Sequence, residues 1–339
     1  MKKNITALLI FLTSLSFKTS AHEVPGKTLT VPTEVNKWFG AWEMVCKKIY
    51  RVDSLKAVEF VFFDAKYIYS TSNISVPAGE IIDGPSLLGK RFTWKRKEHE
   101  GKITLPTEQI VPVGLMSFAS PLENENAFFV MPLLSFWEAA GVKSKELGLE
   151  LLVTGVFLHE FSHSQQMQNF GKKMTWYEQH NKFTVDFSDD IVQDYFEKDS
   201  IYELQFRKET SRFYEAASDK ADLSLLTGQA LGMHNARQEK YFTGDLEIFK
   251  EIDNFFLTME GLGQYTMYAW LVHPEGANIP AEIAQKAVRR GGKSWSQEEG
   301  LSLFLVLSKI SVPANWSGLM FGNETISVID LIKKGTGKK

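Results

Sequence analysis

Two histidines and a glutamate share one short stretch of the sequence. His159, Glu160 and His163 form the pattern H-E-x-x-H within residues 151–167, LLVTGVFLHEFSHSQQM. On a helix of about 3.6 residues per turn, the two histidines lie about 40° apart, so their imidazoles share one face and can bind a single ion. Zinc favours imidazole ligands, and a catalytic zinc site keeps one position open for water. Glu160 would reach that water and act as its general base.

The residues around this pattern predict a buried helix. No proline occurs between Glu146 and Phe170, and apolar side chains surround the motif on several sides of the predicted helix. Two histidines and a glutamate are costly to bury without partners, and a metal ion would be such a partner. The alternative is a core network of hydrogen bonds that contains no metal.

The motif and its flanks resemble the zincin metallopeptidases. The residues from Val156 to Ser164 have the uncharged character that those enzymes show around H-E-x-x-H, although Gln165 stands where an apolar residue is usual. The metzincin extension is absent, because Gln166 and Asn169 occupy the positions of its glycine and third histidine. The aspzincin pattern is not evident either, which leaves the gluzincins, whose zinc site is completed by a glutamate from a later helix.

This resemblance implies an activity as well as a ligand set. A gluzincin is a zinc metallopeptidase, so the implied substrate is a peptide or protein and the implied cofactor is one Zn²⁺ per chain. The alternative is a zincin-like exported protein that binds zinc, or is structural, and has no catalytic activity.

The predicted third ligand is Glu215, in the segment Y-E-A-A-S-D. This segment resembles the E-x-x-x-D of thermolysin-like and neprilysin-like enzymes. In those enzymes the aspartate forms a hydrogen bond with a zinc-bound histidine, a role that Asp219 would take here. The resemblance therefore predicts zinc on His159, His163 and Glu215.

Glu260 is the main alternative. Its segment, M-E-G-L-G-Q-Y, resembles the E-G-x-A-x-Y of aminopeptidase-like gluzincins, with Gly263 in place of the alanine. Glu260 is also the only charged residue in 254–272, NFFLTMEGLGQYTMYAWLV, where an isolated carboxylate is costly unless a cation or several donors meet it. Gly261 and Gly263 indicate the close approach of another helix.

The choice between the two glutamates stays open at this point. Burial favours Glu260, whereas motif and spacing favour Glu215, which follows the second histidine by 52 residues against 97 for Glu260. Glu209, at the edge of the apolar face of a long helix predicted at 199–235, is a third possibility.

Other parts of the site are less specific. The resemblance implies a tyrosine or histidine that donates to the developing negative charge, and the candidates are Tyr265, Tyr268, His234 and His180. A packed aromatic ring or a surface histidine is the simpler interpretation of each. The segment 127–131, AFFVM, is either an edge strand that binds an extended peptide or an ordinary core strand.

The N-terminus has the pattern of an export signal. Lys2 and Lys3 precede an apolar stretch at 5–17, and Thr19-Ser20-Ala21 resembles a cleavage site, which predicts a signal peptide at 1–21. The stretch is short for a bilayer, so we expect no stable membrane span after cleavage and an exported protein, periplasmic or secreted. Loss of Lys2, Lys3 and Lys18 would change the net charge from −3 to −6, which argues against a nucleic-acid partner. Cys46 is the only cysteine and has no intramolecular partner.

The overall pattern predicts an α+β fold with two parts. A mainly β region at 22–140 precedes a helical catalytic region at 141–339, which has a zincin-like lobe carrying the H-E-x-x-H helix. The predicted β segments are 56–71, 92–98, 103–118 and 126–132, after a short helix at 36–50. The predicted helices are 146–170, 199–235, 244–272, 295–310 and 325–334, with a polar connector at 171–197.

Overall fold

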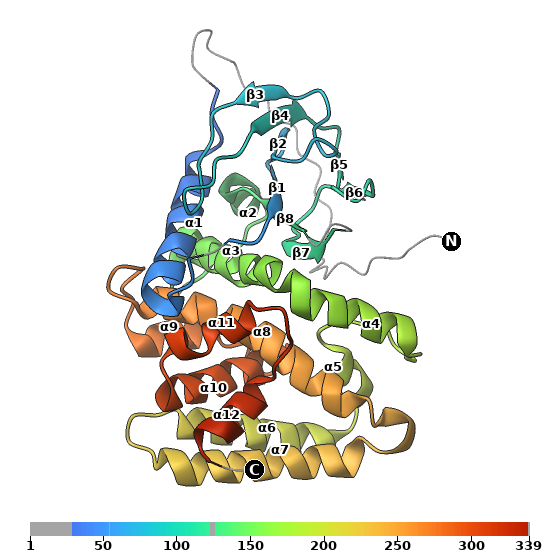
Figure 1. The fold of residues 1–339 in the computed structure, drawn as a ribbon, viewed down its shortest axis with the longest axis vertical. Helices are drawn as coiled ribbons and strands as arrows, with labels where there is room; N and C mark the ends of the chain where they lie inside the picture. Colours follow the sequence, from blue (N-terminus) through green and yellow to red (C-terminus); the bar gives the residue numbers. More distant parts are fainter. Residues whose placement is uncertain (1–28, 54, 123–125, 338–339) are drawn as a thin grey trace.

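The computed structural model describes residues 29–53, 55–122 and 126–337. A region that contains a sheet is followed by a region of helices, so the coarse α+β prediction is confirmed (Figure 1). The predicted signal peptide lies outside the described residues. Within them, no helix combines the length and the apolar character that crossing a membrane requires.

Six strands form the main sheet, in the order β3-β4-β2-β1-β8-β7. Neighbouring strands are antiparallel except β1 and β8, which are parallel. The strands are β1 (Val58–Phe63), β2 (Tyr67–Ser70), β3 (Glu80–Ile82), β4 (Trp94–Glu98), β7 (Phe118–Pro121) and β8 (Ala127–Pro132), and β5 (Lys102–Thr104) pairs separately with β6 (Ile110–Pro112).

The position of β8 decides the role of residues 127–131. β8 pairs with β1 on one side and with β7 on the other, so its backbone has no open edge for a peptide. The interpretation as a core strand is therefore the right one, and β7 is the edge strand at this side of the sheet.

Both faces of β1 and β8 are buried, which explains their nearly continuous apolar sequences. Phe60 and Phe129 face the larger core, whereas the next residues along each strand face a second, smaller core. Phe161 of α3 (Gly148–Gln166) stacks on Phe60 with ring centroids 5.6 Å apart, and Phe157 meets Phe129 at 5.4 Å. The helix that carries H-E-x-x-H is thus fixed against the sheet.

α3 lies between the sheet and the helices formed by residues 200–335, whereas the first two helices lie on the same side of α3 as the sheet (Figure 1). From Val153 to Gln166 every residue of α3 except Val156 is buried, as the sequence predicts. The other helices are α1 (Thr33–Met44), α2 (Leu134–Ala139), α4 (Lys172–His180), α5 (Ile191–Phe196), α6 (Ser200–Ala216), α7 (Leu223–Tyr241), α8 (Phe249–Val272), α9 (Ala281–Val288), α10 (Trp295–Ile310), α11 (Ser317–Met320) and α12 (Val328–Gly335).

The prediction of one continuous helix at 199–235 is wrong, because two helices occupy these residues. α6 ends at Ala216, and α7 begins after Asp222, whose side chain accepts a hydrogen bond from the backbone N–H of Leu225. Aspartate and serine compete with helix interiors and favour such N-terminal caps, and the linking residues 217–222 are A-S-D-K-A-D. The connector predicted at 171–197 likewise contains two helices, α4 and α5.

α8 and α10 cross with their backbones in contact. A Cβ atom added at Gly261 would lie 2.6 Å from the backbone of Gly300, and one added at Gly300 would lie 2.6 Å from the Cα of Gly261. Only glycine permits this approach. The expectation that Gly261 allows another helix to come close is confirmed, and α10 is that helix.

Candidate metal centre

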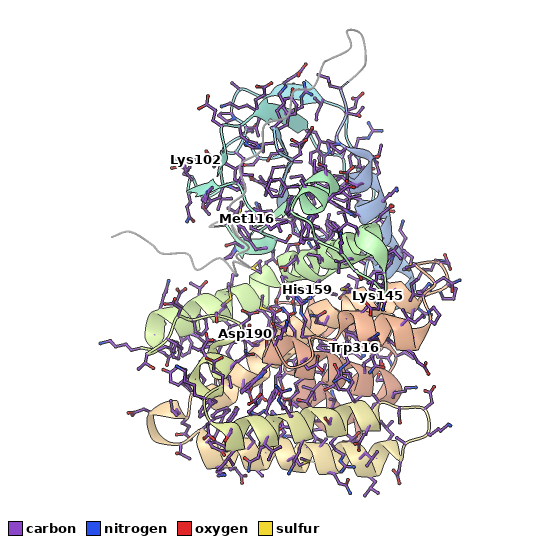
Figure 2. All side chains as sticks on the ribbon, turned by 180° about the vertical axis from the view of Figure 1, so that it is seen from behind. Lys102, Met116, Lys145, His159, Asp190 and Trp316 are labelled. Atoms are coloured by element: carbon purple, nitrogen blue, oxygen red, sulfur yellow. The ribbon has the colours of Figure 1, made fainter. Side chains whose placement is uncertain are left out.

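His159 and His163 lie on one face of α3, as their spacing requires. Their Nε2 atoms are 3.1 Å apart, and both side chains are buried. The ligand atoms of His159, Glu160 and His163 all lie within 4.8 Å of one another. His159 is located in the middle of the molecule, where α3 meets the helices of the second region (Figure 2).

Glu260, on α8, completes the cluster. Its Oε2 lies 3.2 Å from Nε2 of His159, and its Oε1 lies 3.3 Å from Nε2 of His163. The carboxylate is fully buried. Ligand atoms about 2.0–2.1 Å from a tetrahedral zinc lie about 3.3 Å from one another. The distance between the two imidazoles and the distance from each imidazole to its nearer Glu260 oxygen are all of that size.

Glu215 and Asp219 are not part of this cluster, which corrects the ligand set predicted from the resemblance. The Glu215 side chain is 55 % exposed and pairs with Arg212 at 2.8 Å. The Asp219 side chain is 87 % exposed and pairs with Lys309. Because α6 ends at Ala216, these two acids are not aligned one turn apart on a continuous helix that enters the core. Both belong to the solvated surface.

Gly263 gives α8 its close contact with the histidines. A Cβ atom at this position would lie 2.7 Å from Cε1 and Nδ1 of His159. The glycine that replaces the alanine of the aminopeptidase-like pattern therefore makes room for the imidazole. The expectation that this residue permits a close approach is confirmed, and α3 is the partner.

Gly263→Ala is expected to displace His159 and destabilise the fold by about 1–3 kcal/mol through overpacking. Gly232→Ala, inside α7, is the matched control, because a Cβ atom there meets nothing within 4 Å. That control should gain about 0.5–1 kcal/mol, since alanine is the better helix former. Urea denaturation of both variants measures the difference, and a Gly263→Ala protein as stable as the control would contradict the contact.

The burial of the cluster changes its protonation. Desolvation raises the pKa of Glu160 to about 8 and lowers the pKa of His159 to about 4. Burial also opposes the charge on His163, but the carboxylates of Glu260 and Glu160 outweigh it and raise its pKa to about 9. The two imidazoles in turn hold the pKa of Glu260 below its usual range, despite burial.

Two carboxylate oxygens in this cluster accept no hydrogen bond. Oε2 of Glu160 is buried without such a partner, and Oε1 of Glu260 is buried with only the ion-pair contact to His163 at 3.3 Å. Burial, with the negative charge of Glu260 as a further cause, also raises the pKa of Asp190 to about 7. Unsatisfied buried carboxylates of this kind are costly, and a bound cation would compensate them. The residues present therefore fit a divalent metal.

Two glutamines orient the ligands. Oε1 of Gln166 lies 3.3 Å from Nδ1 of His163, so a proton on Nδ1 would leave the Nε2 lone pair available. Nε2 of Gln297, on α10, donates to Oε2 of Glu260 at 3.1 Å. Such partners fix the orientation of metal ligands and their basicity.

A pocket of about 210 Å³ opens beside His159 and Glu160. Most of its wall is apolar and comes from α3, α8, α9 and the segment before β7. Its other polar groups are Ser117, Gln264 and Arg290, and the Oγ of Ser117 is buried without a hydrogen-bond partner. No motif in the sequence marks Ser117 or Arg290 as part of a site. Of these three residues, only Gln264 could have been suggested by the sequence, because it follows Glu260 by one helical turn.

The residues proposed to stabilise negative charge lie elsewhere. Tyr265 packs against Phe304 with ring centroids 5.9 Å apart, and the exposed His180 stacks on Trp176 at 4.8 Å. Tyr268 is half-buried. None of the four candidates lines the pocket beside His159.

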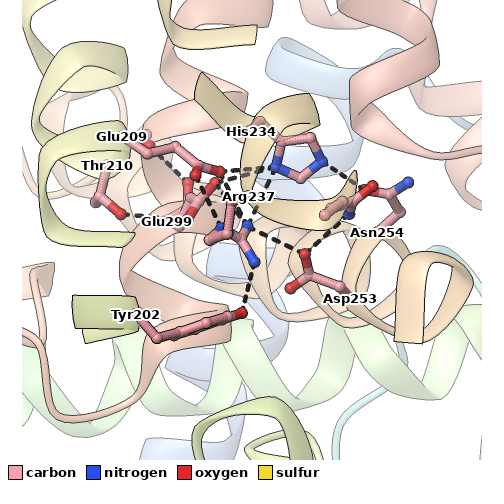
Figure 3. A network of polar contacts seen from close by, with 10 residues as sticks. Tyr202, Glu209, Thr210, His234, Arg237, Asp253, Asn254 and Glu299 are labelled. Atoms are coloured by element: carbon pink, nitrogen blue, oxygen red, sulfur yellow. Dashed lines mark hydrogen bonds and ion pairs between the residues drawn. The ribbon is translucent and has the colours of Figure 1, made fainter. Parts of the chain in front are cut away.

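The fourth candidate, His234, belongs to a second buried polar cluster (Figure 3). Its Nδ1 lies 2.7 Å from Oε1 of Glu209, and its Nε2 lies 2.9 Å from Oδ1 of Asn254. Arg237 donates to both oxygens of Glu209 at 2.8 and 2.9 Å, and it contacts Asp253 at 3.1 Å. Glu209, the third possibility for the metal ligand, therefore binds His234 and Arg237 in this cluster and is not part of the cluster around His159.

The second cluster has the chemistry of an ion-pair network rather than of a metal site. Ligand atoms of Glu209, His234 and Glu299 come within 4.8 Å of one another, but the guanidinium of Arg237 already supplies a cation among them. Burial opposes the charge on His234, yet Glu209 raises its pKa to about 10, and burial raises the pKa of Glu299 to about 8. These protonation states balance the buried charges. The network joins α6, α7, α8 and α10.

Comparisons with known proteins assign neither a family nor a function to this chain. The chain matches no family model, no curated protein and no solved structure. The function must therefore be inferred from the geometry of the site and from the motif.

Proposed function

We propose that this chain is an exported zinc metallohydrolase that hydrolyses peptide bonds. The observation that supports the proposal is the buried cluster of His159, His163 and Glu260, with Glu160 beside it. The two Nε2 atoms are 3.1 Å apart, and they lie 3.2 and 3.3 Å from the two oxygens of the Glu260 carboxylate. Peptides as the substrate class, and export, rest on the sequence resemblance and on residues 2–21.

The residues have separable roles in this reaction. His159, His163 and Glu260 would hold the metal, which when bound polarises a substrate carbonyl and lowers the pKa of a water next to it. Glu160 lines the pocket and has one oxygen without a hydrogen-bond partner. A bound cation beside it would oppose the desolvation that raises its pKa and would favour the carboxylate, which could then accept a proton from the attacking water. Glu160 then passes that proton to the leaving amine.

Glu160→Gln tests the chemical role directly. The amide keeps the shape of the side chain but cannot take a proton, so we expect hydrolysis to fall by about 10²–10⁴-fold while zinc content stays at one per chain. Peptide cleavage by mass spectrometry and metal content by plasma emission measure the two quantities.

The wild type decides between an enzyme and a metal-binding protein without activity. Zinc without cleavage of any peptide in a mixed-sequence library would favour the non-catalytic alternative. A wild type that holds no zinc after purification and zinc addition would overturn the proposal as a whole.

A further inference from the structure

Arg290 brings a positive charge to the pocket beside His159 and Glu160. It is one of the lining residues, and its charge acts on both of those groups. Its Nε donates to Oε1 of Gln297 at 2.5 Å. Among the residues that the structure describes, no carboxylate lies within ion-pair distance of its guanidinium.

The chain on either side holds Arg290 in place. The backbone N–H groups of Arg290 and Gly291 donate to Oε2 of Glu298 at 2.6 and 3.1 Å. Gly291 and Gly292 then adopt positive φ values of 62° and 81°, which lets the chain turn directly into α10. The backbone of this residue is therefore fixed at the start of the helix that also carries Gln297.

Gln297 joins Arg290 to the metal-ligand cluster. Its amide oxygen accepts hydrogen bonds from Arg290 and from Gln264 at 2.7 Å, and its amide nitrogen donates to Glu260. One side chain thus positions both Glu260 and Arg290. A guanidinium held in this way loses little freedom when it binds a planar anion.

The remaining wall of the pocket determines what could bind there. Trp137, Leu152, Val156 and Met267 line it, so an apolar group would be buried next to the guanidinium. The volume of about 210 Å³ is below the range of about 300–1,000 Å³ that drug-sized ligands occupy, so the pocket suits one amino-acid residue. Arginine is the side chain best matched to a carboxylate, which it binds through two parallel hydrogen bonds.

We propose that Arg290 binds a substrate carboxylate and that the preferred substrates are short peptides whose apolar C-terminal residue enters this pocket. The proposal rests on the proposed function for the cleavage step, but the binding of a carboxylate can be measured without it. A C-terminal carboxylate and an acidic side chain share the chemistry that Arg290 would recognise.

Calorimetric titration with N-acetyl-L-phenylalanine tests the binding. We expect the wild type to bind this acid about ten- to a hundredfold more tightly than N-acetyl-L-phenylalaninamide, because one charge-assisted pair distinguishes them. Arg290→Gln should remove the preference, and Arg290→Lys should keep part of it. Lys286→Gln is the matched control, since Lys286 is on neighbouring α9 and pairs with Glu146 outside the pocket. Equal affinity for acid and amide, or no binding of either, would overturn the proposal.

Hydrolysis assays then separate the two sources of the carboxylate. A short peptide with a free C-terminal phenylalanine should be cleaved with a KM about ten- to a hundredfold lower than its C-terminal amide, and Arg290→Gln should abolish this difference. An amidated peptide with glutamate in place of the last phenylalanine is the third substrate. Preference for that peptide would overturn the C-terminal assignment. Loss of all cleavage in the wild type, with acid binding intact, would contradict the proposed function alone.

Discussion

Glu260→Ala is expected to lose bound zinc, whereas Glu215→Ala is expected to keep it. Glu260 lies 3.2 and 3.3 Å from the two histidine Nε2 atoms, while Glu215 is exposed and paired with Arg212. Since removal of a residue that merely orients a ligand weakens metal binding by about 10–100-fold, loss of a direct ligand should weaken it by at least about 100-fold. Metal content after dialysis against a weak chelator measures the effect.

Two further variants complete this experiment. Glu260→Gln keeps the side-chain volume and removes the charge, so a loss of zinc in this variant would not be caused by a cavity. His159→Ala is the positive control for a lost ligand. Zinc retained in Glu260→Gln but lost in Glu215→Ala would return the third ligand to α6 and would contradict the site.

Replacement of Arg237 by Met is expected to reduce the free energy of unfolding by about 3–5 kcal/mol, because it leaves buried carboxylates without their cation. Arg237 is 2 % exposed, contacts Glu209 and Asp253, and donates to the hydroxyl of Tyr202 at 2.7 Å. Methionine fills much of the same volume. The loss should therefore come from the uncompensated charge more than from packing.

Arg207→Met is the matched control for this variant. Arg207 also pairs with a glutamate, Glu203, but its side chain is 48 % exposed, and such pairs contribute about 0–1 kcal/mol. Urea denaturation followed by tryptophan fluorescence measures both variants. Similar losses for Arg237→Met and Arg207→Met would show that the buried network does not contribute more than a surface ion pair.

The sequence is most informative where a strong local pattern coincides with burial. H-E-x-x-H in an uninterrupted apolar segment predicts the helix, its burial and the shared face of His159 and His163, all of which the structure has. The end of α10 at Ile310 and its start at Trp295 also agree with the predicted 295–310. In these segments the local preference and the tertiary environment favour the same structure.

The third ligand shows where local reasoning fails. A site with Glu215 requires Asp219 one turn further along the same helix, but that helix ends at Ala216, and the aspartates that follow favour a turn and a cap. Glu260 is indicated only by the energetic cost of one carboxylate among apolar neighbours, and it is the residue that lies against the histidines. The cost of burial was the better guide here than a short motif.

Gln297, Glu298 and Arg290 could not be assigned from the sequence, because their relation to the site exists only in the packed structure. Gln297 reaches Glu260 because α10 crosses α8 at two glycines, and nothing in the local sequence around Gln297 encodes that crossing. The order of strands in the sheet could not be predicted from the sequence either, because the pairing of β1 with β8 joins residues more than sixty positions apart.

The short helix α9 has a consequence for how this protein could diversify. The groups proposed to carry out hydrolysis lie on α3 and α8, where almost every neighbouring position is buried and a substitution would cost stability. Ala287 and Arg290, by contrast, belong to a helix of eight residues and the turn after it, and four of the eight residues of that helix are exposed. Selection for a new substrate could therefore act on this wall of the pocket while leaving the reacting groups untouched.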